Sequence, residues 1–252
     1  MSPENLRRSW NRIAGEQSTP RPCATDDISY GALAPPESAL GLLGNVAGKR
    51  VLDLGCGDGR NCVALARMGA LCTGVDLSDA QIQLAAAAVE QEGLDVHLSC
   101  SEMLEFLSSQ PDDEFDIALS IFSLPYVSKL TDLFHHLHRV LRPEGLFIFA
   151  TNHPLSDIVQ MDSGAVVIHR SYFESAPEEW NWTTSRGIAV TPLVTFRRTV
   201  AELLNPLSAA GFCLEKLVEP EPLAENGADR DQMEVYSRVP AALICRARAV
   251  KA

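Results

Sequence analysis

The 252-residue sequence predicts an α/β protein, a single domain built on a doubly wound parallel sheet. Between residues 50 and 151, short apolar runs of strand length alternate five times with segments of helical period. The first of these runs ends in a cluster of glycines, which is typical of the ligand-binding edge of such a sheet. Hydrophobic residues make up 46% of the chain and charged residues 21%, an ordinary composition for a protein with one large core.

The expected elements follow one another in a regular order. Ser78 is placed to cap the second helix, with Gln81 as its capping-box partner three residues later. The fourth helix is strongly amphipathic, because one face carries Leu130, Leu133, Phe134, Leu137, Val140 and Leu141. The predicted strands span residues 50–55, 71–77, 95–100, 115–122 and 146–151, and the predicted helices span residues 60–69, 78–93, 102–108 and 130–145.

The rest of the chain divides into an N-terminal segment and an insertion. Residues 1–36 form an expected cap segment, polar and with one short helix around residues 6–17, ahead of a main domain at residues 37–252. Residues 152–199 break the rhythm with aromatic residues, prolines and no clean period, which predicts an insertion after the fifth strand. The expected closing elements are a helix at 199–211 and strands at 212–220 and 240–249, separated by a polar loop at 219–239.

Charge and cysteine content argue against several classes of protein. The formal net charge is −12 and basic residues are scattered, which argues against a nucleic-acid partner. The seven cysteines include no CxxC pair, so a disulfide framework or zinc site is not expected. His135, His136 and His138 lie mainly off the apolar face of their helix without carboxylate or thiol partners, and no metal is expected. The start of the chain lacks a signal core, and no apolar run approaches the ~18 residues of a membrane span, so we expect a cytoplasmic protein with no membrane partner.

The stretch "GCGDG" follows the first strand directly. Gly55 and Gly57 let the chain turn sharply and allow a ligand to lie against the backbone. The helix that begins near Arg60 points its free N–H groups at the same place, which favours an anionic group there. Asp76, at the end of the second strand, is suited to accept hydrogen bonds from a ribose diol. These features indicate a ligand that contains adenosine.

The spacing of the glycines distinguishes between such ligands. The dinucleotide fingerprint is G-x-G-x-x-G, whereas Arg60 occupies the place of the third glycine here. With Asp53 inside the strand, this loop resembles the first motif of the class I S-adenosylmethionine-dependent methyltransferases. "TGVDLS" resembles their acidic motif, "FDIALSIFSLPYV" their fourth-strand motif, and "LHRVLRPEGLFIFAT" the helix and strand that follow. The resemblance covers roughly residues 30–250 and implies a Rossmann-like sheet of seven strands, mostly parallel, with helices on both faces and the last strand antiparallel.

The resemblance also implies a set of cofactor-binding residues. The glycine loop of the family contacts the amino-acid end of the cofactor, and the ribose hydroxyls would bind Asp76. Glu102 stands where the family commonly has an aspartate for the adenine amino group; if Ser101 fills that role instead, the correspondence shifts by one residue. The full implied set is Tyr30, Asp53, Gly55, Cys56, Gly57, Asp76, Leu77, Glu102, Met103 and Ser120.

Residues for the methyl acceptor are expected after the fourth and fifth strands. His153, just past the fifth strand, is the candidate general base, because the pKa of a histidine suits proton uptake near neutrality. The alternative is a loop histidine that shapes the pocket without taking a proton. The expected acceptor-binding residues are Phe122, Tyr126, His153, Tyr172, Trp180 and Trp182; the aromatic members equally suit a second interpretation, in which they only pack the insertion against the core.

The resulting prediction is an enzyme that transfers a methyl group from S-adenosylmethionine to a small-molecule acceptor and releases S-adenosylhomocysteine. A hydroxyl oxygen is the expected acceptor atom, and secondary metabolism is a plausible setting. Three alternatives stay open: an N- or S-methyltransferase, a protein that binds the cofactor without transfer, and a nucleotide-dependent oxidoreductase, which the glycine spacing disfavours. The oligomeric state is not readable from the sequence.

Overall fold

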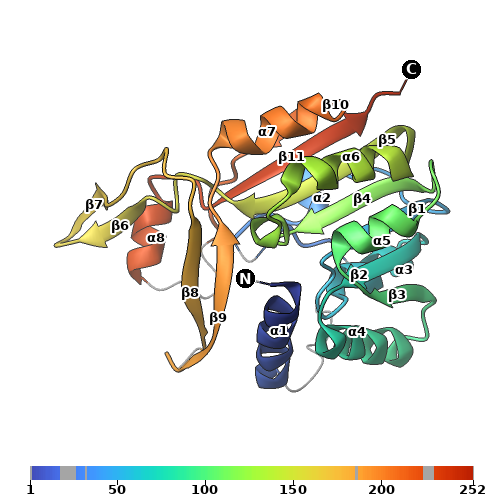
Figure 1. Cartoon of the computed structure of the whole chain (residues 1–252), viewed down its shortest axis with the longest axis horizontal. Coiled ribbons are helices and arrows are strands. Elements are labelled where there is room, and N and C mark those ends of the chain that lie inside the picture. Colours follow the sequence, from blue (N-terminus) through green and yellow to red (C-terminus); the bar gives the residue numbers. More distant parts are fainter. Residues whose placement is uncertain (1, 18–26, 32, 185–186, 224–229, 252) are drawn as a thin grey trace.

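The computed structural model describes residues 2–17, 27–31, 33–184, 187–223 and 230–251. Parts of the expected N-terminal segment, residues 18–26, and of the expected polar loop, residues 224–229, lie outside the described residues. The described residues form a seven-stranded sheet with helices on both faces, and two small hairpins beyond one end of it (Figure 1). In this part of the chain, no helix is long and apolar enough to cross a membrane.

The sheet has the order β10-β11-β5-β4-β1-β2-β3. Neighbouring strands from β5 to β3 are parallel, whereas β11 is antiparallel to both β5 and β10. The expected doubly wound sheet with an antiparallel last strand is therefore confirmed. Its strands are β1 (Arg50–Leu54), β2 (Leu71–Asp76), β3 (Val96–Cys100), β4 (Phe115–Ile121), β5 (Leu141–Asn152), β10 (Phe212–Val218) and β11 (Ala242–Ala249).

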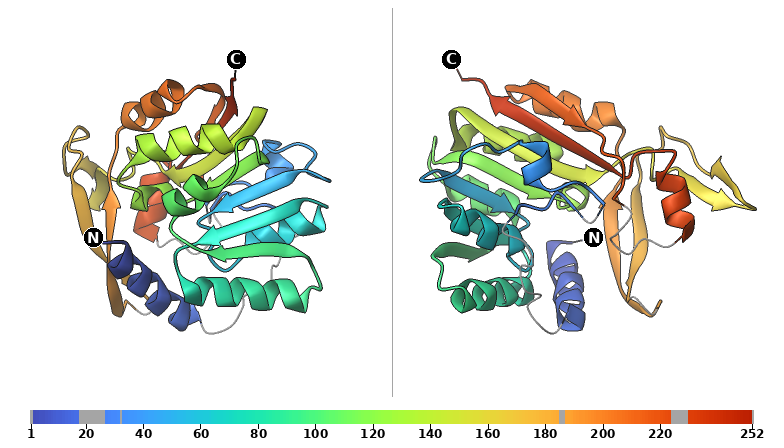
Figure 2. Two further views of the ribbon diagram at one scale, coloured as in Figure 1. Left: turned by 45° about the vertical axis from the view of Figure 1, so that its right-hand side comes forward. Right: turned by 180° about the vertical axis from the view of Figure 1, so that it is seen from behind.

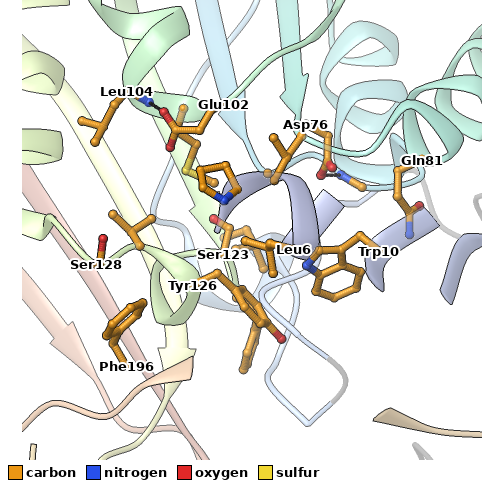
Figure 3. Close-up of a pocket in the computed structure, with 18 of the residues that line it drawn as sticks. Leu6, Trp10, Asp76, Gln81, Glu102, Leu104, Ser123, Tyr126, Ser128 and Phe196 are labelled. Atoms are coloured by element: carbon orange, nitrogen blue, oxygen red, sulfur yellow. Dashed lines mark hydrogen bonds between the residues drawn. The ribbon is translucent and has the colours of Figure 1, made fainter. Parts of the chain in front are cut away.

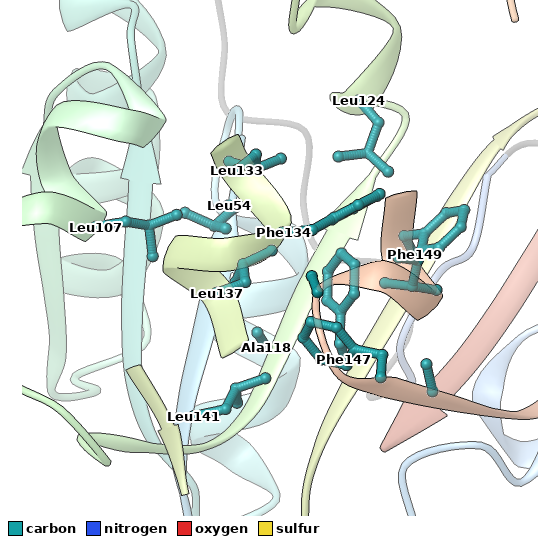
Figure 4. Close-up of a cluster of buried hydrophobic side chains, with 14 of the residues drawn as sticks. Leu54, Leu107, Ala118, Leu124, Leu133, Phe134, Leu137, Leu141, Phe147 and Phe149 are labelled. Carbon is teal, nitrogen blue, oxygen red and sulfur yellow. The ribbon is translucent and has the colours of Figure 1, made fainter. Parts of the chain in front are cut away.

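Two apolar clusters fill the space between the sheet and its helices. On one face, α5 (Met103–Ser109), α6 (Leu130–Val140) and α7 (Val200–Ala209) bury the larger cluster, in which Phe134 packs against both Phe147 and Phe149 (Figure 4). On the other face, α3 (Arg60–Arg67) and the segment around α2 (Glu37–Leu40) cover the second cluster. Because β1 to β5 run parallel, their carboxyl ends lie at the same edge of the sheet, where a ligand site is expected.

The junction between α6 and β5 differs from the sequence prediction by five residues. Helix α6 ends at Val140, because Arg142 precedes a proline and is biased toward an extended conformation, and Leu141 already pairs with Phe115 of β4. Strand β5 therefore begins five residues earlier than expected. Helix α4 (Asp79–Gln91) is capped by the Ser78 side chain as expected, but the backbone N–H of Ser78 donates to Asp76 and not to the Gln81 side chain, so the capping box is incomplete.

The insertion contains two β-hairpins that the sequence did not reveal. They are formed by β6 (Val159–Asp162) with β7 (Ala165–Ile168), and by β8 (Pro177–Thr183) with β9 (Ala189–Phe196). Helix α8 (Arg230–Tyr236) lies in the expected polar loop and packs against β6. The N-terminal helix α1 (Pro3–Gln17) contacts both α4 and β9, so it lies between the core and the insertion (Figure 2).

Candidate functional site

The glycine loop after β1 is held by backbone hydrogen bonds to β2. The N–H groups of Gly55 and Cys56 donate to the carbonyl of Val75, at 2.7 and 3.0 Å. Gly55 has a positive φ of 77°, and a Cβ atom placed on it would lie 2.4 Å from the Cβ of Ser123. Gly57 also has a positive φ, 54°, but a Cβ atom there would meet no protein atom within 4 Å. Packing and backbone conformation both demand glycine at position 55, whereas position 57 leaves its bare backbone open.

Asp76 connects this loop to the end of β2. One of its carboxylate oxygens accepts the N–H of Gly57 at 2.9 Å, and the other accepts the N–H of Ser78 at 2.9 Å. Burial raises the pKa of Asp76, and these two backbone hydrogen bonds oppose that rise. A carboxylate has about four lone-pair positions, so two N–H donors leave room for two more from a ligand.

Asp53 lies beneath the loop and is only 2% exposed. Burial raises the pKa of its carboxyl to about 7, and the nearby charge of Asp76 adds to the rise. The thiol of Cys62 donates to Asp53 at 3.6 Å. Cys56 is 9% exposed, and contact with Cys62 together with burial raises the pKa of its thiol. Cys56 therefore lacks the thiolate character of a nucleophile.

A pocket of about 280 Å³ opens in front of the loop (Figure 3). Its walls come from α1, the glycine loop, the ends of β2 and β4, the starts of α4 and α5, and β9. The indole of Trp10 and the ring of Tyr126 form one wall, with centroids 5.3 Å apart. The lining residues are Pro3, Leu6, Trp10, Gly55, Gly57, Asp76, Leu77, Gln81, Glu102, Met103, Leu104, Ile121, Phe122, Ser123, Tyr126, Val127, Ser128, Lys129 and Phe196.

Half of the residues expected from the sequence line this pocket. They are Gly55, Gly57, Asp76, Leu77, Glu102, Met103, Phe122 and Tyr126. Glu102 is the N-cap of α5, and one of its oxygens accepts the N–H groups of Leu104 and Glu105. No hydrogen bond within the described residues engages its other oxygen, which leaves that atom available to a ligand.

The remaining expected cofactor residues support the site from behind. Asp53 and Cys56 are buried, and Ser120 is fully buried with its hydroxyl against that of Ser123, which donates in turn to the carbonyl of Leu54. Tyr30 is also fully buried, and its hydroxyl donates to Glu37 at 2.7 Å. Tyr30 therefore packs in the core beside α2 and does not line the pocket, so its implied cofactor contact stays a prediction.

His153 does not line the pocket. Its backbone N–H donates to the carbonyl of Ala241 at 3.0 Å, which places it beside β11, on the side of β5 away from β4. The ring is 2% exposed; Nδ1 accepts the N–H of Leu155, and Nε2 donates to Glu219 at 2.8 Å. Burial lowers the pKa of His153, and Glu219 opposes this. Both ring nitrogens are hydrogen-bonded outside the pocket. The ring is therefore not placed to take a proton from an acceptor bound in the pocket.

Three aromatic residues of the insertion also lie outside the pocket. Trp180 is 37% exposed on β8, and Trp182 is half-buried on the same strand. The hydroxyl of Tyr172 accepts the N–H of Val200 at the start of α7. This placement favours the second interpretation, in which they pack the insertion: Tyr172 ties the insertion to α7, and the insertion contributes Phe196 to the pocket.

Sequence reasoning missed Trp10, Gln81 and Phe196. Trp10 and Phe196 come from segments far from the motifs, so no local pattern identifies them. Gln81 was assigned to helix capping instead. Within the described ranges, no group of three or more histidine, cysteine, aspartate or glutamate side chains is placed to hold a metal ion.

Comparisons with known proteins agree with this geometry. Residues 51–145 match a family model described as a methyltransferase domain. A crystal structure of an S-adenosylmethionine dependent methyltransferase from Mesorhizobium loti is 30% identical, with a TM-score of 0.67, over 84% of this chain and 95% of that one. A putative S-adenosylmethionine dependent methyltransferase from Listeria monocytogenes is 24% identical, with a TM-score of 0.69, over 85% and 97% of the two chains; at this identity the likeness shows the fold alone.

A curated relative carries a more specific name. The ubiquinone biosynthesis O-methyltransferase of Maricaulis maris is 35% identical over 104 residues. The match covers 41% of this chain and 41% of that protein.

Proposed function

The chain belongs to the class I S-adenosylmethionine-dependent methyltransferases, and we propose that it methylates a hydroxyl oxygen of a small, largely apolar molecule. The observation that carries this proposal is that the pocket is continuous from Gly57 and Asp76 to the aromatic residues Trp10, Tyr126 and Phe196. The first group suits an adenosyl ligand and the second a flat acceptor. The Maricaulis maris O-methyltransferase supports oxygen as the acceptor atom.

Four groups of residues contact the cofactor at its end of the pocket in this proposal. We assign the ribose hydroxyls to Asp76, which keeps lone pairs free after binding Gly57 and Ser78. The open backbone at Gly57 takes the amino-acid part, because nothing occupies the space where a side chain would be. Leu77 and Met103 pack against the adenine, and the unengaged oxygen of Glu102 accepts its amino group.

Asp53, Cys56 and Ser120 act indirectly in this proposal. Asp53 is buried under the loop with Cys56, and Ser120 holds Ser123, which lines the pocket. Their role is to fix the shape of the loop rather than to touch the ligand. Phe122 and Tyr126 remain as acceptor-binding residues from the original set, with Trp10 and Phe196 added.

Bound S-adenosylmethionine would supply a methyl group on a sulfonium: the methyl carbon would pass from sulfur to the acceptor oxygen, the electron pair of the C–S bond would stay on sulfur, and the proton of the acceptor hydroxyl would go to solvent. The aromatic walls exclude water and align the acceptor, so positioning supplies much of the acceleration. Burial raises the pKa of Tyr126, which keeps its hydroxyl protonated. A phenolic acceptor, whose own pKa is near 10 as in tyrosine, needs little help from a base. We assign His153 a structural role, in which its ring holds the loop that follows β5.

The test is an assay with three acceptors that share one aromatic ring and differ in bearing a hydroxyl, an amine or a thiol. The protein is incubated with S-adenosylmethionine, and S-adenosylhomocysteine and the methylated product are measured by mass spectrometry. Methylation of the hydroxyl compound supports the proposal, and methylation of the amine or thiol alone contradicts it. Asp76→Ala is the control, because it should weaken cofactor binding by about 1–3 kcal/mol.

The alternative of binding without transfer predicts a different result. In that case S-adenosylhomocysteine binds by calorimetry, and no hydroxyl, amine or thiol acceptor is methylated. The setting in secondary metabolism stays a prediction to be tested after the acceptor is known.

A further inference from the structure

Gln81 has a buried side-chain oxygen without a partner. It is the third residue of α4, and its backbone N–H donates to the Ser78 side chain at 3.1 Å. The residue is only 4% exposed, and among the residues that the structure describes, no donor reaches its Oε1. The side chain lines the pocket between Asp76 and Trp10 (Figure 3). Since buried polar atoms are nearly always paired, this oxygen requires an explanation.

The surrounding polar groups are committed elsewhere. The backbone N–H of Ser78, which a capping box would offer to Gln81, donates to Asp76 at 2.9 Å. The hydroxyl of Ser78 donates to Asn11 of α1 at 2.6 Å. The amide of Asn11 donates in turn to Asp79 at 2.8 Å. The start of α4 is therefore satisfied without the side chain of Gln81, which none of these groups engages.

The ligand group that fits this oxygen is a hydrogen-bond donor next to Asp76. A ribose presents two neighbouring hydroxyls, and each has one hydrogen to donate. Each carboxylate oxygen of Asp76 already accepts one backbone N–H. A second acceptor on the same wall allows the two hydroxyls to bind two different residues instead of sharing one carboxylate.

We propose that Gln81 is a specificity residue for the cofactor: its Oε1 accepts a hydrogen bond from one ribose hydroxyl while Asp76 accepts the other. The pocket then distinguishes a ribose from a deoxyribose at two positions. Removing the hydroxyl that faces Gln81 leaves the amide oxygen buried and unpaired, as it is in the free protein. This inference concerns the cofactor end of the pocket and does not depend on the identity or the atom of the methyl acceptor.

The test is a calorimetric titration with S-adenosylhomocysteine and with its 2′-deoxy and 3′-deoxy analogues. It compares the wild type with Gln81→Met, which keeps the length of the side chain and removes its amide. Gln83→Met is the matched control, because Gln83 lies on the exposed side of the same helix and does not line the pocket. Gln81→Leu is a second variant, and melting temperatures confirm that each variant is folded.

The expected result is a selective loss. Gln81→Met should bind S-adenosylhomocysteine about tenfold more weakly than the wild type, in keeping with a lost hydrogen bond to a buried group. For one of the two deoxy analogues, the wild type and Gln81→Met should bind equally well. Gln83→Met should match the wild type for all three ligands.

Two results would overturn the proposal. One is an unchanged affinity of Gln81→Met for S-adenosylhomocysteine. The other is an equal loss for all three ligands, which would mean that Gln81 only shapes the pocket. Because no acceptor is present, these titrations can fail while the proposed methyl transfer stands, and the converse is also true.

Discussion

The indole ring of Trp10 meets the ring of Tyr126 edge to face, with centroids 5.3 Å apart and planes at 83°. This contact joins the N-terminal helix to the turn after β4 across the front of the pocket. Helix α1 is hydrogen-bonded to both parts of the molecule that it separates. The side chain of Asn11 bonds to the side chains of Ser78 and Asp79 in the core. The hydroxyl of Ser9 donates to the carbonyl of Pro192 in the insertion at 2.7 Å. The N-terminal helix is therefore a wall of the site rather than an appendage.

Trp10→Ala should weaken ligand binding without unfolding the domain. The change removes one wall of the pocket and the aromatic pair, and such pairs contribute about 0.5–1.5 kcal/mol beyond burial of their area. We expect the KM of the hydroxyl acceptor to rise several-fold in the mass-spectrometric assay, because Trp10 belongs to the acceptor end of the pocket. Arg12→Ala, at an exposed position of the same helix, is the control and should bind as the wild type does. Equal KM values in all three proteins would remove α1 from the site.

Gly55→Ala and Gly57→Ala should separate folding from binding. Both positions have positive φ, which costs an alanine about 1–2 kcal/mol. At position 55 the added Cβ also collides with Ser123, so the loss of stability should reach about 3 kcal/mol or more. At position 57 it meets only open space, so the protein should fold but bind S-adenosylhomocysteine poorly. Urea denaturation and calorimetry check the two properties, and normal binding by Gly57→Ala would refute the assignment of the loop.

Asp53 should make the stability depend on pH. Its pKa rises from an ordinary 3.8 to about 7 on folding, because burial disfavours the charged form. The folded protein then holds a proton that the unfolded chain releases, so this contribution is complete below pH 4 and is lost as the pH rises through 7. Relative to Asp53→Asn, the wild type should lose on the order of a few kcal/mol between pH 4 and 8. Urea denaturation between pH 4 and 8 measures the free energy of unfolding of both proteins. The same pH dependence in the wild type and in Asp53→Asn would contradict the prediction.

His153→Ala should affect stability more than catalysis. The change removes two hydrogen bonds of a buried ring, to Leu155 and Glu219, and should lower the free energy of unfolding by about 1–3 kcal/mol. The turnover number and its pH dependence should stay close to those of the wild type, because the ring lies outside the pocket. A large drop in turnover, with loss of a titration step near neutrality, would restore the general base.

The motifs of the sheet were predictable because their signals are local. Gly55, Gly57 and Asp76 sit at fixed places relative to strands whose apolar runs are readable from the sequence, and all three reach the pocket. Glu102 was found in the same way, one residue before α5. When a side chain lies at the end of a single strand, its residue type and its position in the sequence are enough to predict that it reaches the site.

The walls of the pocket were not predictable because tertiary contacts bring them there. Trp10 precedes the first strand by forty residues and Phe196 ends β9, so neither shares a local pattern with the motifs. Strand β8 escaped detection because its alternation of polar and apolar residues is confined to residues 179–183, and five of its seven residues are exposed on a two-stranded hairpin. His153 was misplaced because its position just after β5 says nothing about whether the chain then turns toward β4 or β11.

The most direct test is a crystal structure of the protein with S-adenosylhomocysteine. The account predicts the ribose against Asp76 and Gln81, the adenine between Leu77 and Met103, and the sulfur beside Gly57, facing the space lined by Tyr126. A ligand bound outside this crevice, or inside it with its sugar turned away from the Asp76 carboxylate, would contradict the account.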